Sequence, residues 1–401
     1  MATIHYSEIR GRSPGFLVLL AASGALVLAG LVAAWTMEHQ GHAVTGMSNR
    51  IVWGMPHVFA VFLIVAASGA LNVASVASVF GRPLYKPLAR LSALLALTLL
   101  AGGLAILVLD LGRPDRLIVA MTHYNFTSIF AWNIFLYTGF FAVVALYLWT
   151  MFERRMNGYV GRAGMLAFVW RLVLTTGTGS IFGFLVAREP YNSALLAPLF
   201  IVMSFSFGLA IFLLVLMAAC RLTSRALGDV VVNRLGRLLG VFVAAVLYFV
   251  AVYHLTNLYV ARQHEVERFI LLDGGVYTLL FWLGQVLLGG VVPLVLLFSP
   301  LAMRARGALA AAAACVIAGG LAQVYVIIVG GQAYPQAMFP DKVVSSSFFD
   351  GVVAHYAPSL PEVALGVGGV ALALALTMVG LKVLPFLPRS LADRDVDSAA
   401  A

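Results

Sequence analysis

Apolar residues in this chain occur in ten separate runs, most of them about as long as the ~20 residues that one helical crossing of a bilayer requires. Charged residues make up only 10% of the 401 residues, whereas a soluble domain contains roughly 25%. We therefore expect an all-α integral membrane protein with about ten transmembrane helices. The predicted spans are residues 15–35, 52–79, 89–110, 126–151, 164–187, 194–220, 238–261, 275–299, 308–330 and 362–385.

The distribution of positive charge predicts the orientation, because Lys and Arg are enriched in cytoplasmic loops. Most of the 25 such residues lie before the first span, after the last span or in alternate loops between them. These positions are Arg10, Arg12, Arg82, Lys86, Arg90, Arg154, Arg155, Arg162, Arg221, Arg225, Arg234, Arg237, Arg304, Arg306, Lys382, Arg389 and Arg394. We therefore expect both termini in the cytoplasm of a bacterial inner membrane. The first run is too long for the apolar core of a signal peptide, so we expect a retained helix.

Composition also bears on cofactors and partners. The net charge of +9 comes from short loops between apolar runs, which fits membrane topology better than a nucleic-acid surface. Cys220 and Cys315 are the only cysteines in the sequence. Two thiols are too few for a structural zinc site or an iron–sulfur cluster of the usual type.

Two extramembrane segments complete the predicted organisation. Residues 331–361 form a long loop on the outer face that is rich in proline and aromatic residues. Such a loop indicates a lid or a docking surface for a partner, although it could also lie on lipid headgroups. Residues 386–401 form a cytoplasmic tail, which we expect to be disordered after Pro388.

Ionisable residues inside membrane spans are costly and are therefore candidates for function. His57 and Asp110 lie at similar depth near the outer ends of adjacent predicted helices. A His–Asp pair can hydrogen-bond a quinone carbonyl and accept a proton, because the carboxylate fixes the imidazole tautomer. The same two side chains could instead be a structural pair that locks two helices together. His57 and His254 at matched depth leave open a b-type haem held by two imidazoles.

The outer end of the fourth predicted helix carries aromatic and hydroxyl side chains. Ser128 and Trp132 are four residues apart and therefore share one helix face, and Tyr124 lies just before them. An aromatic ring beside a hydroxyl suits a quinone ring, so we predict that these three residues line the quinone pocket. Interfacial Trp and Tyr residues are also common where no ligand binds.

Arg171 lies inside the fifth predicted span and is followed by Thr175 and Thr178. A buried Arg beside hydroxyl groups could order a proton path toward the cytoplasm. Alternatively, the guanidinium could extend along the helix to the inner interface, and the helix would then be only structural.

The run Asp110-Leu111-Gly112-Arg113-Pro114, followed by Asn125-Phe126-Thr127-Ser128 and Trp132, resembles the NrfD/polysulfide-reductase membrane-subunit family. The ten-helix length is similar to the branch that includes DsrP and the membrane subunits of alternative complex III. Tyr124 stands where the family pattern leads us to expect proline.

The resemblance implies two four-helix bundles, at residues 52–187 and 194–330, with flanking helices at 15–35 and 362–385. It implies a site for menaquinone or ubiquinone in the first bundle, in which His57 and Asp110 handle protons and Arg113 orders the turn. It further implies a ferredoxin-like iron–sulfur subunit at the outer face and no haem or cluster in this protein itself. The function would be electron exchange between the quinone pool and that partner, within a respiratory complex.

Two other classes of function remain open from the sequence. A secondary transporter or proton-translocating module would need no electron chemistry, and helices broken at the midplane would favour it. A purely structural anchor would tolerate substitution of His57 and Asp110.

Overall fold

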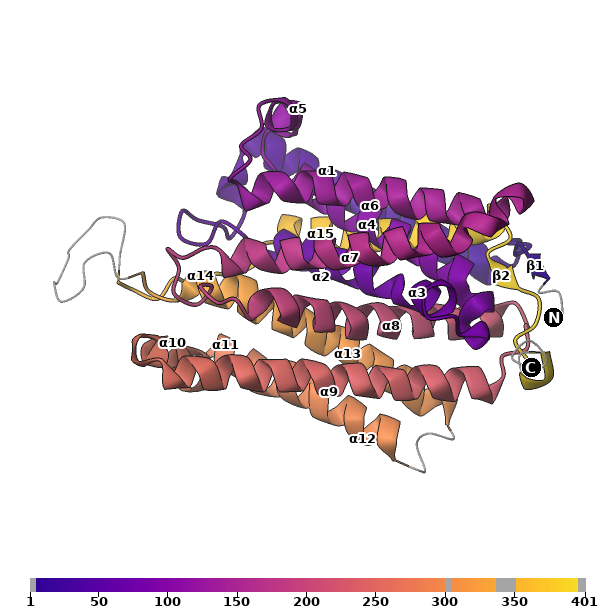
Figure 1. The fold of residues 1–401 in the computed structure, drawn as a ribbon. Helices are drawn as coiled ribbons and strands as arrows, with labels where there is room; N and C mark the ends of the chain where they lie inside the picture. Colours follow the sequence, from indigo (N-terminus) through magenta and orange to yellow (C-terminus); the bar gives the residue numbers. More distant parts are fainter. Residues whose placement is uncertain (1–4, 300–304, 337–350, 396–401) are drawn as a thin grey trace.

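The computed structural model describes residues 5–299, 305–336 and 351–395. In this part of the chain, ten helical spans are long and apolar enough to cross a membrane. The short strands β1 (Tyr6–Ser7) and β2 (Leu387–Pro388) pair at one end of the molecule (Figure 1). We call this end the terminal end and the opposite one the distal end. The prediction of an all-α protein with ten transmembrane helices is confirmed.

Several spans consist of more than one helical segment. In sequence order they are α1 (Pro14–Gln40), α2 with α3 (Met55–Ala70, Asn72–Ser78), η2 with α4 (Pro83–Leu88, Ala89–Leu109), α6 (Ile129–Phe152), η4 with α7 (Arg154–Tyr159, Val160–Gly183), α8 (Leu196–Leu222), α9 (Asp229–Tyr259), α11 with η7 and α12 (Val276–Leu279, Leu280–Val291, Val292–Phe298), α13 with η8 and α14 (Arg306–Tyr325, Val326–Gly330, Gly331–Ala333) and α15 (Leu360–Val383). Shorter elements are η1 (His42–Val44), η3 (Pro114–Arg116), α5 (Leu117–Thr122), η5 (Ala261–Gln263), α10 (His264–Arg268) and η6 (Phe269–Asp273).

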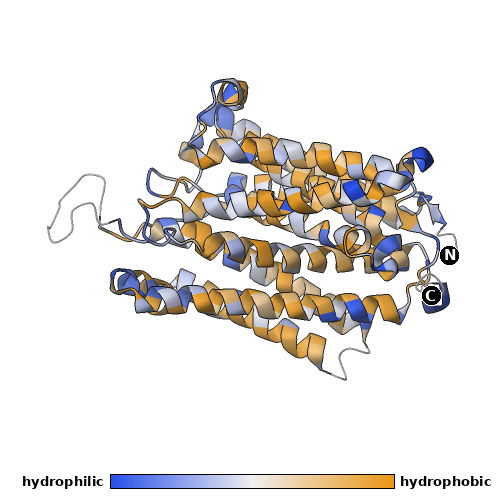
Figure 2. Ribbon diagram, in the orientation of Figure 1, coloured by the Kyte–Doolittle hydropathy of each residue, from blue (hydrophilic) through white to orange (hydrophobic). Residues whose placement is uncertain are grey.

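The helices pack in two groups of four. In the first group α2 contacts α4 and α7, and α6 closes the group by contacting both α4 and α7. In the second group α8 contacts α9 and α13, and α12 contacts both of these. Helices α1 and α15 pack on each other beside the first group. Hydrophobic residues cover the helices along most of their length, and hydrophilic residues concentrate at the two ends (Figure 2).

Helices α2 and α8 join the two groups through a close backbone contact. A Cβ atom added at Gly69 would overlap the backbone carbonyl of Ser204, and one added at Gly208 would overlap the backbone at Ala70. Small residues at such a crossing let two helices approach closely, which strengthens their packing where no water drives association.

The second span is interrupted between α2 and α3 by a side chain from a neighbouring helix. The hydroxyl of Ser92 on α4 donates to the carbonyl of Ala70 and accepts from the amide of Ala74. It therefore replaces the backbone hydrogen bond that would join these two residues, a known cause of helix distortion. This break results from packing between two helices.

Several predicted helix boundaries are wrong by a few residues, because hydrogen bonding does not stop where the apolar run stops. Helix α1 continues past Trp35 to Gln40, and α9 begins at Asp229 instead of residue 238. Helix α6 begins only at Ile129, because the Ser128 hydroxyl caps its first turn.

The expectation of a disordered tail after Pro388 is wrong for residues 389–395. The amide of Leu391 donates to Ala226, and Gly228 donates back to Leu391. The Asp393 carboxylate accepts from the amides of Asp229 and Val230, and so caps α9. These bonds hold the tail against the loop between α8 and α9.

Only part of the predicted lid at residues 331–361 can be placed. Phe339, Phe348 and Phe349 lie outside the described residues. Tyr334 packs on Phe269, with ring centroids 5.6 Å apart, and Tyr356 is bonded to neighbouring helices. The two aromatic side chains that can be placed therefore contribute to the packing of the distal end.

Candidate functional site

Asp110 stands at the end of α4, where the backbone turns sharply. It is the C-cap residue, and its amide bonds to the carbonyl of Ile106. Gly112 follows with φ +69°, a conformation that is unfavourable for residues with a Cβ atom. A Cβ atom there would also lie 3.1 Å from Cε1 of His42. The Asp-Leu-Gly turn therefore lets the carboxylate face inward and leaves room for a neighbouring histidine.

Two histidines approach the Asp110 carboxylate. Nδ1 of His57 lies 3.0 Å from Oδ2, and Nε2 of His42 lies 3.7 Å from Oδ1 and 3.2 Å from the Asp110 backbone carbonyl. The carboxylate is 1% exposed, whereas the His57 and His42 side chains are 23% and 35% exposed. Within the described residues, neither carboxylate oxygen makes a hydrogen bond of good geometry. The buried Asp110 carboxylate is thus connected to the surface of the protein through two partly exposed imidazole rings.

The predicted contact between His57 and Asp110 is confirmed, and His42 is an addition that the sequence analysis missed. His42 lies in η1, outside every span, so a search limited to intramembrane residues passes over it. In the part of the protein that the structure describes, no three His, Cys, Asp or Glu side chains are placed to hold a metal ion.

The loop that carries His42 is tied to the start of α15. The carboxylate of Glu362, which is fully buried, accepts from the amides of Gly46 and Ser359 and from the hydroxyl of Tyr356. Burial and the neighbouring Glu362 carboxylate raise the pKa of Tyr356, so its hydroxyl remains a donor. The same hydroxyl accepts from the amide of Met55 at the start of α2. The two segments that carry His42 and His57 therefore share one anchor.

Aromatic rings cover the other side of His57. The ring of Trp53 lies 6.2 Å from that of His57 and packs on Phe130, Phe182 and Tyr191 at centroid distances of 5.8–6.4 Å. Gln332 of α14 fixes the backbone of Trp53 by accepting from its amide and donating to its carbonyl. The aromatic wall beside the acid is thus built on Trp53 and held in place by the second helix group.

The structure does not bring Tyr124 and Trp132 to His57. Their rings pack on each other at 6.0 Å, and the Trp132 indole donates to the carbonyl of Phe126. Ser128 is occupied as the cap of α6. On this helix Phe130, which was not predicted, contacts the Trp53 ring beside His57.

Arg113 lies away from the acid on the exposed side of the turn. Its guanidinium binds the Asp115 carboxylate through two hydrogen bonds of 3.1 Å. The hydrogen bond from Arg113 holds the pKa of Asp115 below its ordinary value. Both side chains are more than half exposed, so this pair orders the loop after Asp110 without contacting the carboxylate.

Arg171 is completely buried, so it does not extend to the interface as one alternative supposed. Its Nη2 donates to Asn72, and the rings of Phe168 and Phe205 lie 4.9 and 5.0 Å from its guanidinium carbon. Thr175 donates to Ser68. Thr178 bonds to the carbonyl of Leu174 in its own helix.

His254 lies in the second helix group, where it contacts the carboxylate of Glu267. His57 is in the first group and contacts Asp110. Because each histidine has its own carboxylate partner in a different group, this arrangement does not favour one haem shared by both.

Taken together, these features define a multi-pass membrane protein with an acid–histidine site at one end of a four-helix group. The family profile described as "Polysulphide reductase, NrfD" matches residues 43–336, and the chain belongs to this family. The match begins after α1 and ends before α15, so these two helices lie outside it.

The chain is 28% identical to the Hdr-like menaquinol oxidoreductase integral membrane subunit of Archaeoglobus fulgidus, over 98% of its own length and 99% of that protein. It is 26% identical to the C subunit of the polysulfide reductase of Wolinella succinogenes, over 71% of its own length and 96% of that protein. Protein NrfD of Escherichia coli is 28% identical over 67% of the present sequence and 90% of its own. The archaeal relative therefore extends over the outer helices as well.

Proposed function

We propose that this protein is the quinone-binding membrane subunit of a respiratory oxidoreductase complex. The observation that carries the proposal is the buried Asp110 carboxylate, with His57 in contact and Trp53 beside it, in a member of the NrfD family. Relatives that are named as subunits of a menaquinol oxidoreductase and of a polysulfide reductase support this reading. Menaquinone or ubiquinone would serve as the substrate.

The residues of the site fit the proton chemistry of a quinol. Oxidation of a quinol to a quinone releases two protons and two electrons, and reduction of a quinone takes up the same number. His57 would contact one ring oxygen and exchange a proton with it, while Asp110 holds the imidazole in place and takes part in the transfer. His42 contacts the same carboxylate and provides a second route for a proton to the surface.

The aromatic side of the site would bind the ring. Trp53 is fixed by Gln332, and Phe130 and Phe182 surround it, so a flat ring could pack there at little entropic cost. Further from His57, the hydrophobic tail of the quinone would pass along Tyr124, Ser128 and Trp132. Arg113 would order the turn that carries Asp110.

The electrons require an acceptor outside this protein, because two cysteines cannot hold a cluster relay. We propose a ferredoxin-like iron–sulfur subunit that docks on the distal end, close to His57. The excess of Lys and Arg at the terminal end supports a proposed orientation with that end in the cytoplasm and the site at the outer face of a bacterial inner membrane.

A polar cluster on the terminal side of the site consists of Arg171, Thr175 and Ser68. It supports a proton path from the site toward the terminal end, with Thr178 on the distal side of the cluster. The alternative function, a secondary transporter, would be favoured by helices that are broken at the midplane. The break between α2 and α3 is filled by the Ser92 hydroxyl, so it offers no substrate site.

A fluorescence-quench titration with a quinol-analogue inhibitor tests the proposal. We expect saturable binding to the wild-type protein, and an affinity lower by at least about tenfold in His57→Ala, since a hydrogen bond to a charged or polarised group contributes roughly 1.5–3 kcal/mol. His123→Ala removes an exposed histidine at the distal end and should bind as the wild type does. Linear partitioning that is identical in all three proteins would contradict a quinone site.

A further inference from the structure

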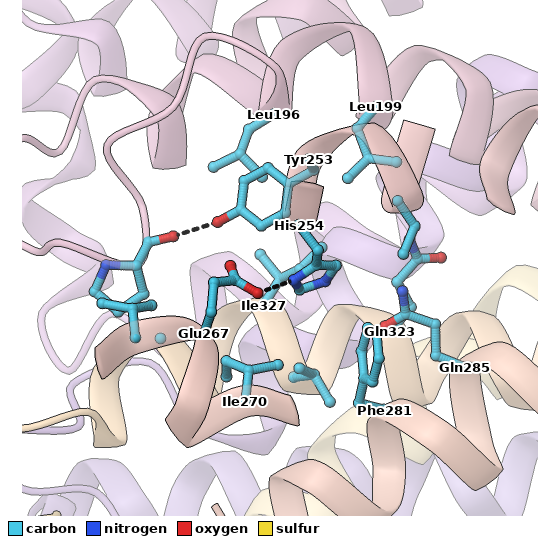
Figure 3. A pocket seen from close by; sticks show the side chains of 15 residues that line it. Leu196, Leu199, Tyr253, His254, Glu267, Ile270, Phe281, Gln285, Gln323 and Ile327 are labelled. Atoms are coloured by element: carbon cyan, nitrogen blue, oxygen red, sulfur yellow. Dashed lines mark hydrogen bonds and ion pairs between the residues drawn. The ribbon is translucent and has the colours of Figure 1, made fainter. Parts of the chain in front are cut away.

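A second buried acid–histidine pair lies at the distal end of the second helix group, where the proposed quinone site does not reach. Nδ1 of His254 lies 2.6 Å from Oε2 of Glu267 (Figure 3). The side chain of Asn257 donates to Oε1 of Glu267 at 2.8 Å. The Glu267 carboxylate is 1% exposed and the His254 side chain 14%. No ion pair between this carboxylate and a lysine or arginine occurs among the described residues.

The pair borders a cavity of about 50 Å³. A single water needs only about 10–15 Å³ of such space, so the cavity has room for several waters but not for a quinone ring. Gln285 and Gln323 line it on the side away from Glu267 (Figure 3). Gln323 is 2% exposed, and its Nε2 has no hydrogen-bond partner among the described residues. A buried donor of this kind needs a partner, and the cavity has room for a water that would provide one.

The walls of the cavity contain all three π-helical segments in the described residues. Ile270 comes from η6, Phe281 and Gln285 from η7, and Val326 and Ile327 from η8. A π-helical turn carries an extra residue relative to an α-helix and is often found at functional sites. Three such segments meet around one small cavity, which points to a functional role for its shape.

The cavity lies next to a surface pocket at the distal end. That pocket is lined by Arg188, Glu189, Arg262 and Tyr334, and it shares Pro190 and Gly331 with the cavity. The Arg262 and Glu189 side chains pair with each other at 3.6 Å. The shared wall brings the buried pair within a short distance of the aqueous phase on that side.

From this geometry we propose that His254 and Glu267 form a proton-binding site that exchanges with the distal aqueous phase through water in the cavity. With a neutral imidazole and an ionised carboxylate the pair carries one negative charge, and one proton added to the Glu267 carboxylate cancels it and leaves a neutral carboxyl group beside a neutral imidazole. Burial of a net charge is costly, which favours uptake of that proton. The other titratable group in the cavity wall is Tyr253, whose hydroxyl donates to the carbonyl of Pro190.

Labelling with dicyclohexylcarbodiimide tests the proposal on the full-length wild-type protein, because this reagent reacts with protonated carboxyl groups in apolar surroundings. We expect an adduct on Glu267, mapped by peptide mass spectrometry, that decreases from mildly acidic to mildly alkaline pH. Glu362 is an internal control, since it is equally buried but its carboxylate accepts three hydrogen bonds, and we expect it to remain unlabelled. Labelling of Glu267 no stronger than that of Glu362 at every pH would overturn the proposal.

A second measurement uses Glu267→Gln in infrared difference spectra between the two pH values. The wild type should show a carboxyl C=O band that is missing from the variant, and a band that persists unchanged would contradict proton binding at Glu267. If the variant does not assemble, the ratio of the two adducts in the wild type still decides. Neither measurement requires a quinone, so a failure here is separate from a failure of the quinone site.

Discussion

Replacement of Asp110 by Asn is expected to reduce the quinol-linked turnover of the assembled complex by about 10²-fold or more, the range typical for loss of a general acid–base group. The amide has nearly the shape of the carboxylate, so the turn at Gly112 and the assembly of the complex should be retained. What is lost is the carboxylate oxygen that contacts His57 and that, in the proposed mechanism, accepts a proton. Steady-state oxidation of a water-soluble quinol by membranes that contain the complex measures the effect.

Asp115→Asn is the matched control for this experiment. Asp115 lies in the same loop, is 60% exposed and forms an ion pair with Arg113. Loss of an exposed ion pair has little effect on stability and should leave turnover near that of the wild type. Equal turnover in Asp110→Asn and Asp115→Asn would remove Asp110 from the mechanism.

Replacement of Gly69 by Ala is expected to destabilise the whole protein, because the added methyl group would overlap the backbone carbonyl of Ser204. Backbone cannot move aside as a flexible side chain can, so α2 and α8 must separate. We expect a cost of at least about 3 kcal/mol, at the upper end of the range for overpacked sites. The measurement is the fraction of protein that remains monodisperse in detergent after heating.

Gly24→Ala serves as the control for this effect. Gly24 lies in α1, and an added Cβ atom meets no other atom within 4 Å. The alanine should therefore leave thermal stability unchanged or slightly increase it, since alanine favours the helix more than glycine does. If Gly69→Ala survived heating as well as Gly24→Ala, the close α2–α8 contact would be wrong.

The sequence was sufficient to predict the transmembrane organisation and one contact in the candidate site. Long apolar runs that are separated by charged loops define the spans, because the bilayer imposes a fixed length on each crossing. His57 and Asp110 could be paired from their depth in adjacent antiparallel helices, and they lie 3.0 Å apart. Their role in quinone chemistry stays a prediction.

Other parts of the site could not be predicted, because they depend on loops that fold back between distant helices. His42 is far from Asp110 in sequence and outside any span, yet it reaches the same carboxylate. Gln332 fixes Trp53 from the second helix group. Apolar periodicity carries no information on such contacts, nor on the π-helical hydrogen bonding of η7.

The aromatic rings next to His57 also could not be predicted from the sequence. The sequence predicts Trp132 in the pocket because it shares a helix face with Ser128, but its indole donates to the carbonyl of Phe126 in its own segment. Phe130, two residues earlier, meets Trp53 instead. Spacing along a helix predicts which residues share a face and not which neighbour that face meets.

Photoaffinity labelling with an azido-substituted menaquinone, mapped by peptide mass spectrometry, tests the central claim most directly. We predict adducts on the peptides that contain Trp53, His57 or Phe130, and we predict that excess unlabelled quinone suppresses them. Adducts that resist competition, or that are confined to other segments such as the wall around His254, would contradict a quinone site between α2 and the start of α6.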